Sequence, residues 1–237
     1  MGWAEAKIVL VTGGSQGIGL ATARAFQALG AAVTITGTRA SAADYGDDLS
    51  GLAYVRCDVS DKAAVAALAA GFDRLDVLVN NAGMGRPDEY TPEGFEAVID
   101  VNLNAVMQLC LLFHDRLAAA GGAIVNVGSL SSFLALREAP AYTASKAAIL
   151  GLTRALADKW APDGIRVNMV APGFIATRMT KRMREHPTAA DNMLRAIPMR
   201  RFGEPEEVAE AIAFLASPAA SYVTGQSLAM DGGLMLR

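Results

Sequence analysis

Ile8-Val9-Leu10-Val11-Thr12-Gly13-Gly14-Ser15-Gln16-Gly17-Ile18-Gly19 is the stretch that decides the fold. Its first four residues are apolar, as in a buried strand, and the residues from Leu20 to Leu29 have a helical pattern. Glycines between a strand and a helix let backbone N–H groups approach a phosphate at the helix N-terminus. The spacing Gly-x-x-x-Gly-x-Gly therefore predicts a dinucleotide-binding turn.

The same glycine-rich residues also match Gly-x-Ser-x-Gly, the nucleophile elbow of many serine hydrolases. Ser15 would be the nucleophile, but such an elbow normally follows several strands, and here it follows the first one. A hydrolase also needs a histidine, and the chain has only His114 and His186. A serine hydrolase using Ser15 remains as a hypothesis of a different class.

Strand and helix patterns alternate along the chain. Strands are expected at residues 8–11, 32–36, 53–57, 75–79, 123–127, 165–170 and 227–230, and helices at 20–29, 61–68, 91–119, 139–160 and 204–216. This alternation predicts an α/β fold, a doubly wound parallel seven-stranded sheet with helices on both faces. We expect a single domain over residues 1–237, with a substrate lid at about 174–201, where no clean strand is expected.

Composition narrows the class of protein. The chain has 237 residues, 52% of them apolar and 19% charged, and a formal net charge of −3. This charge argues against nucleic acid as a partner. The two cysteines, Cys57 and Cys110, have no metal-site spacing, so no metal is expected. No signal region and no apolar run of about 18 residues is evident, so we expect a cytoplasmic protein without a membrane span.

The ends of the second, third and fourth strands carry candidate cofactor contacts. The second strand ends in Gly37-Thr38-Arg39 without an acid, which favours the 2′-phosphate of NADP; NAD is the alternative. Asp58-Val59 follows the third strand, where the acid could accept from an adenine amino group or cap the next helix. Asn80-Asn81-Ala82-Gly83 follows the fourth strand, and such small and amide residues suit close approach of a cofactor.

Four residues could carry proton chemistry. Tyr142 and Lys146 are four apart on an expected helix and therefore share one face, where a cation lowers the pKa of a phenol. Ser129 follows the fifth strand at the edge where ligands bind in α/β folds. Asn102 lies in an apolar helix and must be hydrogen-bonded, either as a brace for the backbone or as a member of a proton relay.

In this order and spacing, the motifs resemble the short-chain dehydrogenase/reductase family over nearly the whole chain. Residues 172–175, 201–209, 222–226 and 231–233 are most similar to its 3-oxoacyl-[acyl-carrier-protein] reductase branch. The segments that carry the resemblance are Thr12–Gly19, Asp58-Val59, Asn80–Gly83, Asn102, Ser129, Tyr142, Lys146 and Pro172–Thr177. One departure is Gly128, where many members have serine.

The resemblance implies an NAD(P)-dependent oxidoreductase that interconverts a ketone or 3-oxoacyl group with a secondary alcohol by hydride transfer. Tyr142 would be the general acid or base, Lys146 would lower its pKa and bind the nicotinamide ribose, and Ser129 would bind the substrate oxygen. Asn102 would hold a water. The implied cofactor contacts are Gly13, Ser15, Gln16, Gly17, Ile18, Gly19, Thr38, Arg39, Asp58, Val59, Asn80, Ala82, Gly83, Tyr142, Lys146, Pro172, Gly173, Ile175 and Thr177.

The same resemblance implies a homotetramer or homodimer, in line with the low charge and the two long apolar helices. The substrate would be a small carbonyl compound or alcohol, or a carrier-linked acyl group. We expect its pocket to be mostly apolar, with lining from Phe133, Leu134, Leu136, Phe174 and Met179. A dinucleotide-binding sensor that lacks turnover is a further hypothesis, although the intact catalytic set argues against it.

Overall fold

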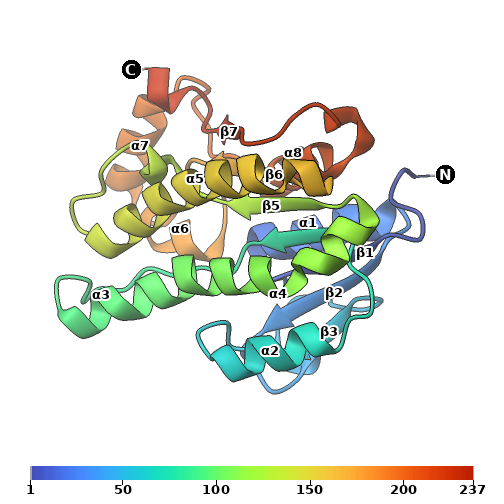
Figure 1. Ribbon diagram of the computed structural model, residues 1–237. Coiled ribbons are helices and arrows are strands. Elements are labelled where there is room, and N and C mark those ends of the chain that lie inside the picture. Colours follow the sequence, from blue (N-terminus) through green and yellow to red (C-terminus); the bar gives the residue numbers. More distant parts are fainter. Residues whose placement is uncertain (1, 237) are drawn as a thin grey trace.

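The computed structural model describes residues 2–236, and it contains one seven-stranded parallel sheet of order β3-β2-β1-β4-β5-β6-β7 (Figure 1). Chain order reverses between β1 and β4, which makes the carboxyl ends of these strands the expected ligand edge. The doubly wound fold predicted from the alternating patterns is confirmed. The strands are β1 Ile8–Val11, β2 Ala32–Gly37, β3 Ala53–Arg56, β4 Val77–Asn80, β5 Ala123–Val127, β6 Arg166–Pro172 and β7 Ser227–Met230.

Helices cover both faces of the sheet and bury two apolar layers (Figure 1). One face is covered by α1 and α8, with Phe26 and Ile212 fully buried. The other is covered by α2, α4 and α5, with Phe113 and Leu109 in its core. The helices are α1 Gly17–Ala28, α2 Lys62–Ala70, α3 Pro92–Ile99, α4 Ala105–Ala120, α5 Pro140–Trp160, α6 Arg178–Arg184, α7 Pro187–Ala196 and α8 Pro205–Ala216.

Three segments differ from the regular alternation. The connection from β2 to β3 has no α-helix within the described chain and forms only a 3₁₀ turn, Ala42–Asp44. The helix expected at 91–119 is interrupted by a π-helical turn, Asp100–Asn104, between α3 and α4. The segment 174–201, expected to be a lid without strands, contains the helices α6 and α7.

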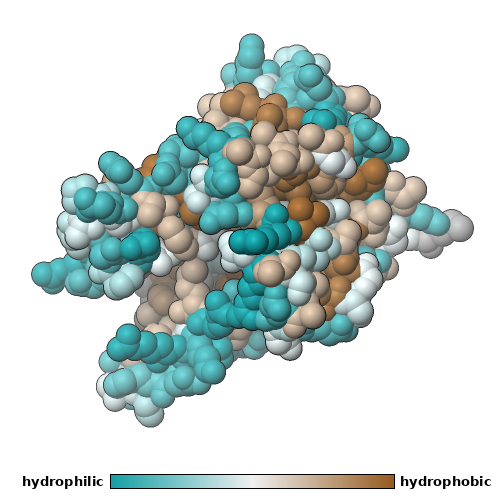
Figure 2. Space-filling model, turned by 90° about the horizontal axis from the view of Figure 1, so that it is seen from below, coloured by the Kyte–Doolittle hydropathy of each residue, from teal (hydrophilic) through white to brown (hydrophobic). Residues whose placement is uncertain are grey.

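The helical stretch from Pro92 to Ala120 is long and apolar enough to cross a membrane, by length and composition only. A core helix meets the same criteria, and Leu109, Phe113 and Leu117 are fully buried against the sheet. The helix is therefore weak evidence for a membrane. Figure 2 shows exposed apolar areas between polar ones, and Leu111 and Leu112 are among the exposed apolar residues of α4.

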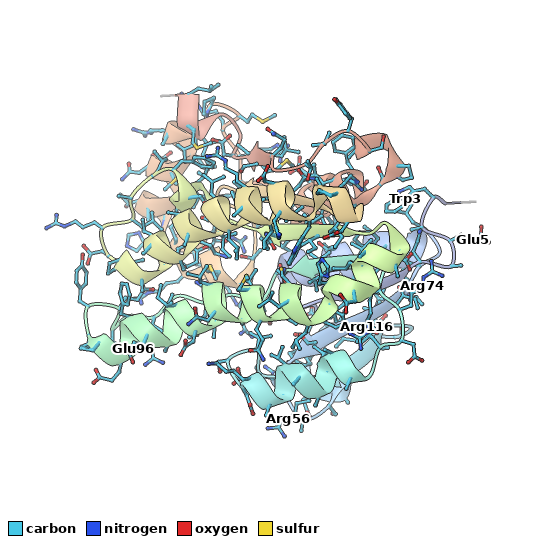
Figure 3. All side chains as sticks on the ribbon, viewed as in Figure 1. Trp3, Glu5, Arg56, Arg74, Glu96 and Arg116 are labelled. Atoms are coloured by element: carbon cyan, nitrogen blue, oxygen red, sulfur yellow. The ribbon has the colours of Figure 1, made fainter. Side chains whose placement is uncertain are left out.

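The edge where the strands begin holds an ion cluster around one buried carboxylate. The carboxylate of Asp76 is 2% exposed and lies 2.9 Å from Nζ of Lys7 and 2.8 Å from Nη2 of Arg74. It also accepts the backbone N–H of Ile8 at 2.9 Å. Figure 3 shows Arg74 on the same side of the molecule as Trp3 near the N-terminus, away from the carboxyl ends of the strands.

Candidate active site

A cleft of about 480 Å³ lies at the carboxyl ends of the strands. A hollow between projecting parts of the surface is visible in Figure 2. The structure brings most of the predicted site residues together in its lining. These are Gly13, Gln16, Gly17, Ile18, Gly19, Thr38, Asp58, Val59, Ala82, Gly83, Ser129, Tyr142, Lys146, Pro172, Gly173, Ile175 and Thr177.

The glycine-rich turn fits a diphosphate. Gly13 and Gly17 have φ of +62° and +54°, which glycine adopts without strain. A Cβ atom on Gly19 would lie 2.4 Å from both Nδ2 of Asn81 and the carbonyl oxygen of Gly13. The first turn of α1 contains no acid, and its N-cap residue Gln16 makes no side-chain capping bond. The N–H groups there remain available to an anion.

Asn81 holds this turn in place, a role that sequence analysis missed. Its Nδ2 donates to the carbonyl oxygens of Thr12 and Gly13 at 2.9 and 3.0 Å. The hydroxyl of Thr12 in turn accepts the backbone N–H groups of Asn81 and Ala82, each at 3.0 Å. The run of two asparagines after β4 was the available signal, but sequence alone did not show which of the two faces the turn.

Three predicted cofactor contacts, Asn80, Ser15 and Arg39, lie outside the lining of the cleft. Asn80 is 3% exposed, and its amide points into the core, where it donates to Oδ1 of Asn126 at 2.9 Å and to Sγ of Cys110 at 3.4 Å. Side chains alternate across a strand, so Asn81, and not Asn80, faces the glycine turn. Ser15 is 4% exposed and likewise does not line the cleft.

The burial of Ser15 also argues against a serine hydrolase. His114 lies near the end of α4 and bonds to Asp115 and Asp163, and His186 caps α7. Neither histidine lines the cleft or bonds to Ser15 in the described part of the chain. The hydrolase hypothesis is therefore wrong, because a buried serine without a base has no activated nucleophile.

Arg39 does not line the cleft but folds back over its own loop. Its guanidinium donates to the carbonyl oxygen of Asp44 and lies 4.8 Å from the ring centroid of Tyr45. The hydroxyl of Tyr45 accepts the backbone N–H of Arg39 at 3.2 Å and sits over Gly37. Gly37 and Thr38 of this strand end do line the cleft.

Asp58 lines the cleft, and its alternative role as a helix cap is wrong. Its Oδ1 accepts the backbone N–H and the hydroxyl of Ser60 at 3.0 and 2.7 Å. Asp61 is the N-cap of α2, where it accepts from the N–H groups of Ala63 and Ala64. The Asp58 carboxylate thus remains at the edge of the cleft, beside Val59.

Tyr142 and Ser129 lie together in the cleft. The first turn of α5 supplies Tyr142, and the end of β5 supplies Ser129. Burial raises the pKa of the Tyr142 phenol, and the negative charge of Glu89 adds to this, whereas a hydrogen bond with the Ser129 hydroxyl opposes it. The phenol is therefore protonated at neutral pH and can donate to a carbonyl oxygen.

Lys146 does not lower the pKa of Tyr142 in this structure, contrary to the expectation from their spacing. Its Nζ lies 5.6 Å from the ring centroid of Tyr142 and donates to the carbonyl oxygen of Val127 at 2.8 Å. The side chain is buried, and burial lowers the pKa of this ammonium to about 8. Burial is the largest influence on the pKa of both groups, which helix spacing alone could not reveal.

Asn102 holds the backbone of Met84, a residue that lines the cleft. It lies in the π-helical turn and is 1% exposed. Its Oδ1 accepts the backbone N–H of Met84, and its Nδ2 donates to the carbonyl oxygen of Met84 and to the hydroxyl of Ser145. The bracing role considered from sequence is present. A relay through Asn102 stays a prediction.

The expected apolar substrate pocket is only partly present. Met179, together with Met84, lines the cleft, but Phe174 lines a separate cavity beside β7. Phe133, Leu134 and Leu136 are 42–45% exposed and lie outside the lining of the cleft. These three residues are in the turn before α5, where sequence shows hydrophobicity but not direction. Residues 2–236 contain no group of three or more His, Cys, Asp or Glu side chains placed to bind a metal ion.

Comparisons with known proteins agree with this geometry. The family model described as enoyl-(acyl carrier protein) reductase matches residues 13–235. The chain is 44% identical over 235 residues to galactitol 2-dehydrogenase (L-tagatose-forming) of Cereibacter sphaeroides, covering 94% of this chain and 92% of that protein. It is 39% identical to the 3-oxoacyl-[acyl-carrier-protein] reductase of Chlamydia muridarum, with 96% and 97% covered.

Solved structures are similar over the same length. A putative 2-deoxy-D-gluconate 3-dehydrogenase from Agrobacterium tumefaciens with bound NADP has a TM-score of 0.88 and 37% identity, with 98% of each chain covered. The chain belongs to the short-chain dehydrogenase/reductase family, as its motifs predicted.

Proposed function

We propose that this member of the short-chain dehydrogenase/reductase family interconverts a ketone and a secondary alcohol with NADP(H). The observation that carries the proposal is the convergence of Ser129, Tyr142 and Lys146 in one cleft with the glycine turn. Bound NADP(H) would supply or accept the hydride, which is chemistry of the cofactor. The protein would bind both partners and move one proton.

Each catalytic side chain then has one task. The hydroxyl of Ser129 donates to the substrate oxygen and holds it beside Tyr142. The phenol of Tyr142 donates a proton to that oxygen in reduction and takes it back in oxidation. The ammonium of Lys146 binds the nicotinamide ribose and favours the phenolate once the site is filled. Asn102 keeps Met84, and with it the cleft wall, in place.

NADP(H) is preferred over NAD(H) in this proposal. The end of β2 offers Thr38 to the cleft and no carboxylate that would repel a 2′-phosphate. The Agrobacterium structure with bound NADP supports the choice. Arg39 would have to leave Asp44 to reach the phosphate, so we propose Thr38 as the main contact. Fluorescence titration with NADPH and NADH, side by side, tests this preference.

The substrate class proposed is a small polyol or its ketose, with a 3-oxoacyl thioester as the second candidate. These classes follow the names of the galactitol dehydrogenase and the acyl-carrier-protein reductase relatives. A panel of galactitol with NADP⁺, and of L-tagatose and acetoacetyl-coenzyme A with NADPH, separates them. Absence of NADPH turnover with a broad ketone panel, together with tight NADPH binding, would favour a sensor.

Tyr142→Phe is the decisive variant. It removes the proton donor and keeps the ring, so the turnover number should fall about 10³-fold while NADPH affinity stays within about twofold. Steady-state rates on the best substrate of the panel and an NADPH titration measure both quantities. A variant with near-wild-type turnover would contradict the proposed chemistry.

We also propose a cytoplasmic homotetramer, with a homodimer as the simpler form. The outer face of α5 carries small exposed residues, Ala144, Ala147, Gly151 and Ala155, and α4 exposes Leu111 and Leu112. Such faces permit close helix packing between subunits. Light scattering after size-exclusion chromatography gives the mass directly, and a monomer of 24.7 kDa would contradict the proposal.

A further inference from the structure

The catalytic helix α5 begins without a capping side chain of its own. Its N-cap residue Ala139 makes no side-chain bond, and Pro140 follows at the first helical position. The first turn of a helix contains backbone N–H groups that need an acceptor. One of these groups is the backbone N–H of Tyr142, which has no acceptor within α5. Tyr142 is also the residue whose side chain is proposed to move the proton.

Glu89 supplies the missing acceptor from the opposite wall of the cleft. Its Oε2 accepts the N–H of Tyr142 at 2.9 Å, and its Oε1 accepts the N–H of Arg86 at 2.9 Å. The two residues joined by the first of these bonds are 53 positions apart in sequence. A carboxylate is a strong acceptor at a helix N-terminus, where the helix dipole also favours negative charge.

The burial of Glu89 is unusual for a charged residue. It is 2% exposed, yet no ion pair in the described part of the chain includes it. Arg86, the nearest arginine in sequence, directs its guanidinium outward to Asp88 at 2.8 Å. Burying a carboxylate without a cation costs free energy unless hydrogen bonds stabilise the charge. Backbone N–H groups and the start of α5 are what stabilise this one.

Glu89 also fixes the loop that forms one wall of the cleft. The loop begins at Asn81, which is bound to the glycine turn, and continues to Met84, which Asn102 holds on both sides. Its end is held at Arg86 by Glu89. A Cβ atom on Gly85 would lie 3.3 Å from Oε1 of Glu89 and 3.8 Å from the ring of Tyr142, which shows how closely loop and helix pack.

We propose that Glu89 is a positioning residue that caps the catalytic helix from the cofactor-side loop and so sets the place of the Tyr142 phenol opposite Ser129. The inference deepens the proposed function, on which it rests. Its charge has a second effect. Burial raises the pKa of Tyr142, and the nearby Glu89 carboxylate raises it further, while Ser129 opposes both. The groups that face the phenol are thus Ser129, Glu89 and, at 5.6 Å from the ring, Lys146.

Glu89→Gln tests both effects at once. Its single amide oxygen can accept only one of the two N–H groups, so the turnover number should fall about 10-fold while the NADPH dissociation constant stays within about twofold. Loss of the charge should move the titration of the Tyr142 phenol to lower pH. Ultraviolet difference spectra of each protein, compared with its own Tyr142→Phe version, isolate that titration from the other four tyrosines.

The titration needs neither substrate nor cofactor, so it distinguishes failure of this inference from failure of the proposed oxidoreductase activity. Asp88→Asn, at an exposed neighbouring carboxylate, is the matched control and should change neither turnover nor titration. Glu89→Asp keeps the charge and should keep the wild-type titration while restoring part of the turnover. Unchanged turnover and titration in Glu89→Gln, or equal losses in Asp88→Asn, would overturn the inference.

A new N-cap on α5 distinguishes the capping effect of Glu89 from the effect of its charge. It also keeps the inference testable if Glu89→Gln folds poorly. Ala139→Ser gives α5 its own N-cap oxygen for the N–H of Tyr142. In the Glu89→Gln background it should restore turnover to within about threefold of wild type and leave the titration at the lower pH. No gain in folding or turnover from Ala139→Ser would mean that capping is not what Glu89 provides.

Discussion

Two carboxylates, each 2% exposed, lie at opposite ends of the sheet and are neutralised in different ways. Asp76, where the strands begin, has two cations, Lys7 and Arg74, and one backbone N–H. Glu89, at the cleft, has two backbone N–H groups and no cation within the described residues. The nearby buried cation, Lys146, has only a carbonyl oxygen.

The difference separates a structural end of the sheet from a functional one. At the beginning of the strands the buried carboxylate of Asp76 is compensated by two cations of the protein, so removing one partner would leave a charge uncompensated. At the cleft, Lys146 and the first N–H groups of α1 have no carboxylate partner within the described residues, and a ligand can supply one. Such a site lowers the free energy of unfolding of the free protein. Variants at the two ends should therefore change different quantities, which the following experiments measure.

The largest effect should come from Lys146→Met at the functional end. Turnover should fall at least about 10³-fold, because the ribose contact and the cation beside Tyr142 are lost. The free energy of unfolding at pH 7 should rise by about 1–3 kcal/mol, since a desolvated ammonium is removed and only one carbonyl bond is lost. Denaturant titration and steady-state rates measure the two changes.

The pH dependence of stability checks the cause. Burial lowers the pKa of Lys146 to about 8 in the folded protein, below its value of about 10.4 in an unfolded chain. The unfolded chain binds more protons between these values, so the wild-type free energy of unfolding should rise with pH over this window. Lys146→Met should lack that rise. A variant less stable than wild type at every pH would contradict the comparison.

The next largest effect should come from Asp76→Asn at the structural end. Its free energy of unfolding should fall by about 3 kcal/mol, because Lys7 and Arg74 lose their buried partner, while turnover stays within about twofold. Burial alone would raise the pKa of Asp76, but Arg74, the N–H of Ile8 and Lys7 together lower it. The advantage of wild type should therefore be present above about pH 4 and disappear in more acidic solution.

Asp115→Asn is the matched control for Asp76, because the Asp115 side chain is fully exposed. Its unfolding free energy should stay within about 0.5 kcal/mol of wild type. Similar losses in both variants would mean that net charge, and not the buried cluster, is responsible.

A smaller effect is expected from Gly19→Ala at the glycine turn. The new Cβ would meet Nδ2 of Asn81 and the Gly13 carbonyl at 2.4 Å, so the turn must open. The NADPH dissociation constant should increase about 10-fold, equivalent to about 1.4 kcal/mol. Gly151→Ala, on the open face of α5 with no atom within 4 Å, is the control and should leave affinity unchanged. Equal affinities in both variants would remove the turn from the proposed site.

The smallest effect should come from His114, which belongs to neither end. Hydrogen bonds from its ring nitrogens to the carboxylates of Asp115 and Asp163 raise the pKa of His114. The raised pKa means that the contribution is complete below about pH 6.5 and is lost as pH rises through the folded value. Since the ring is 27% exposed, His114→Ala should cost less than about 1 kcal/mol at pH 5.5 and less at pH 8.5. Thermal unfolding at both values measures the difference.

Sequence predicted the seven strands, the parallel sheet and most of the cleft, because these follow from local patterns. The apolar run of β1, the glycines after it and the spacing of Tyr142 and Lys146 are each contained in a few adjacent residues. Roles that depend on distant contacts were missed. The bonds of Glu89 to Tyr142 and of Asn81 to Gly13 span tens of residues, and no pattern announces them.

Directions of side chains were the other limit. From the sequence, either Asn80 or Asn81 could face the glycine turn. Only the pleat of β4 decides which of the two amides enters the core. Phe133 and Phe174 are apolar in sequence, yet one is exposed and the other lines a different cavity. The pKa of Tyr142 was misjudged because burial, which sequence does not show, is the largest influence on it.

The π-helical turn at Asp100–Asn104 changes which face of the helix points to the sheet between α3 and α4. A π turn holds one residue more than an α turn, so α3 and α4 are out of phase with each other by about 100°. Deleting a single residue there would restore a regular helix. It would also rotate either α3 or α4 about the helix axis relative to the sheet. The chain is thus intolerant of length changes at this point, although its composition there looks unremarkable.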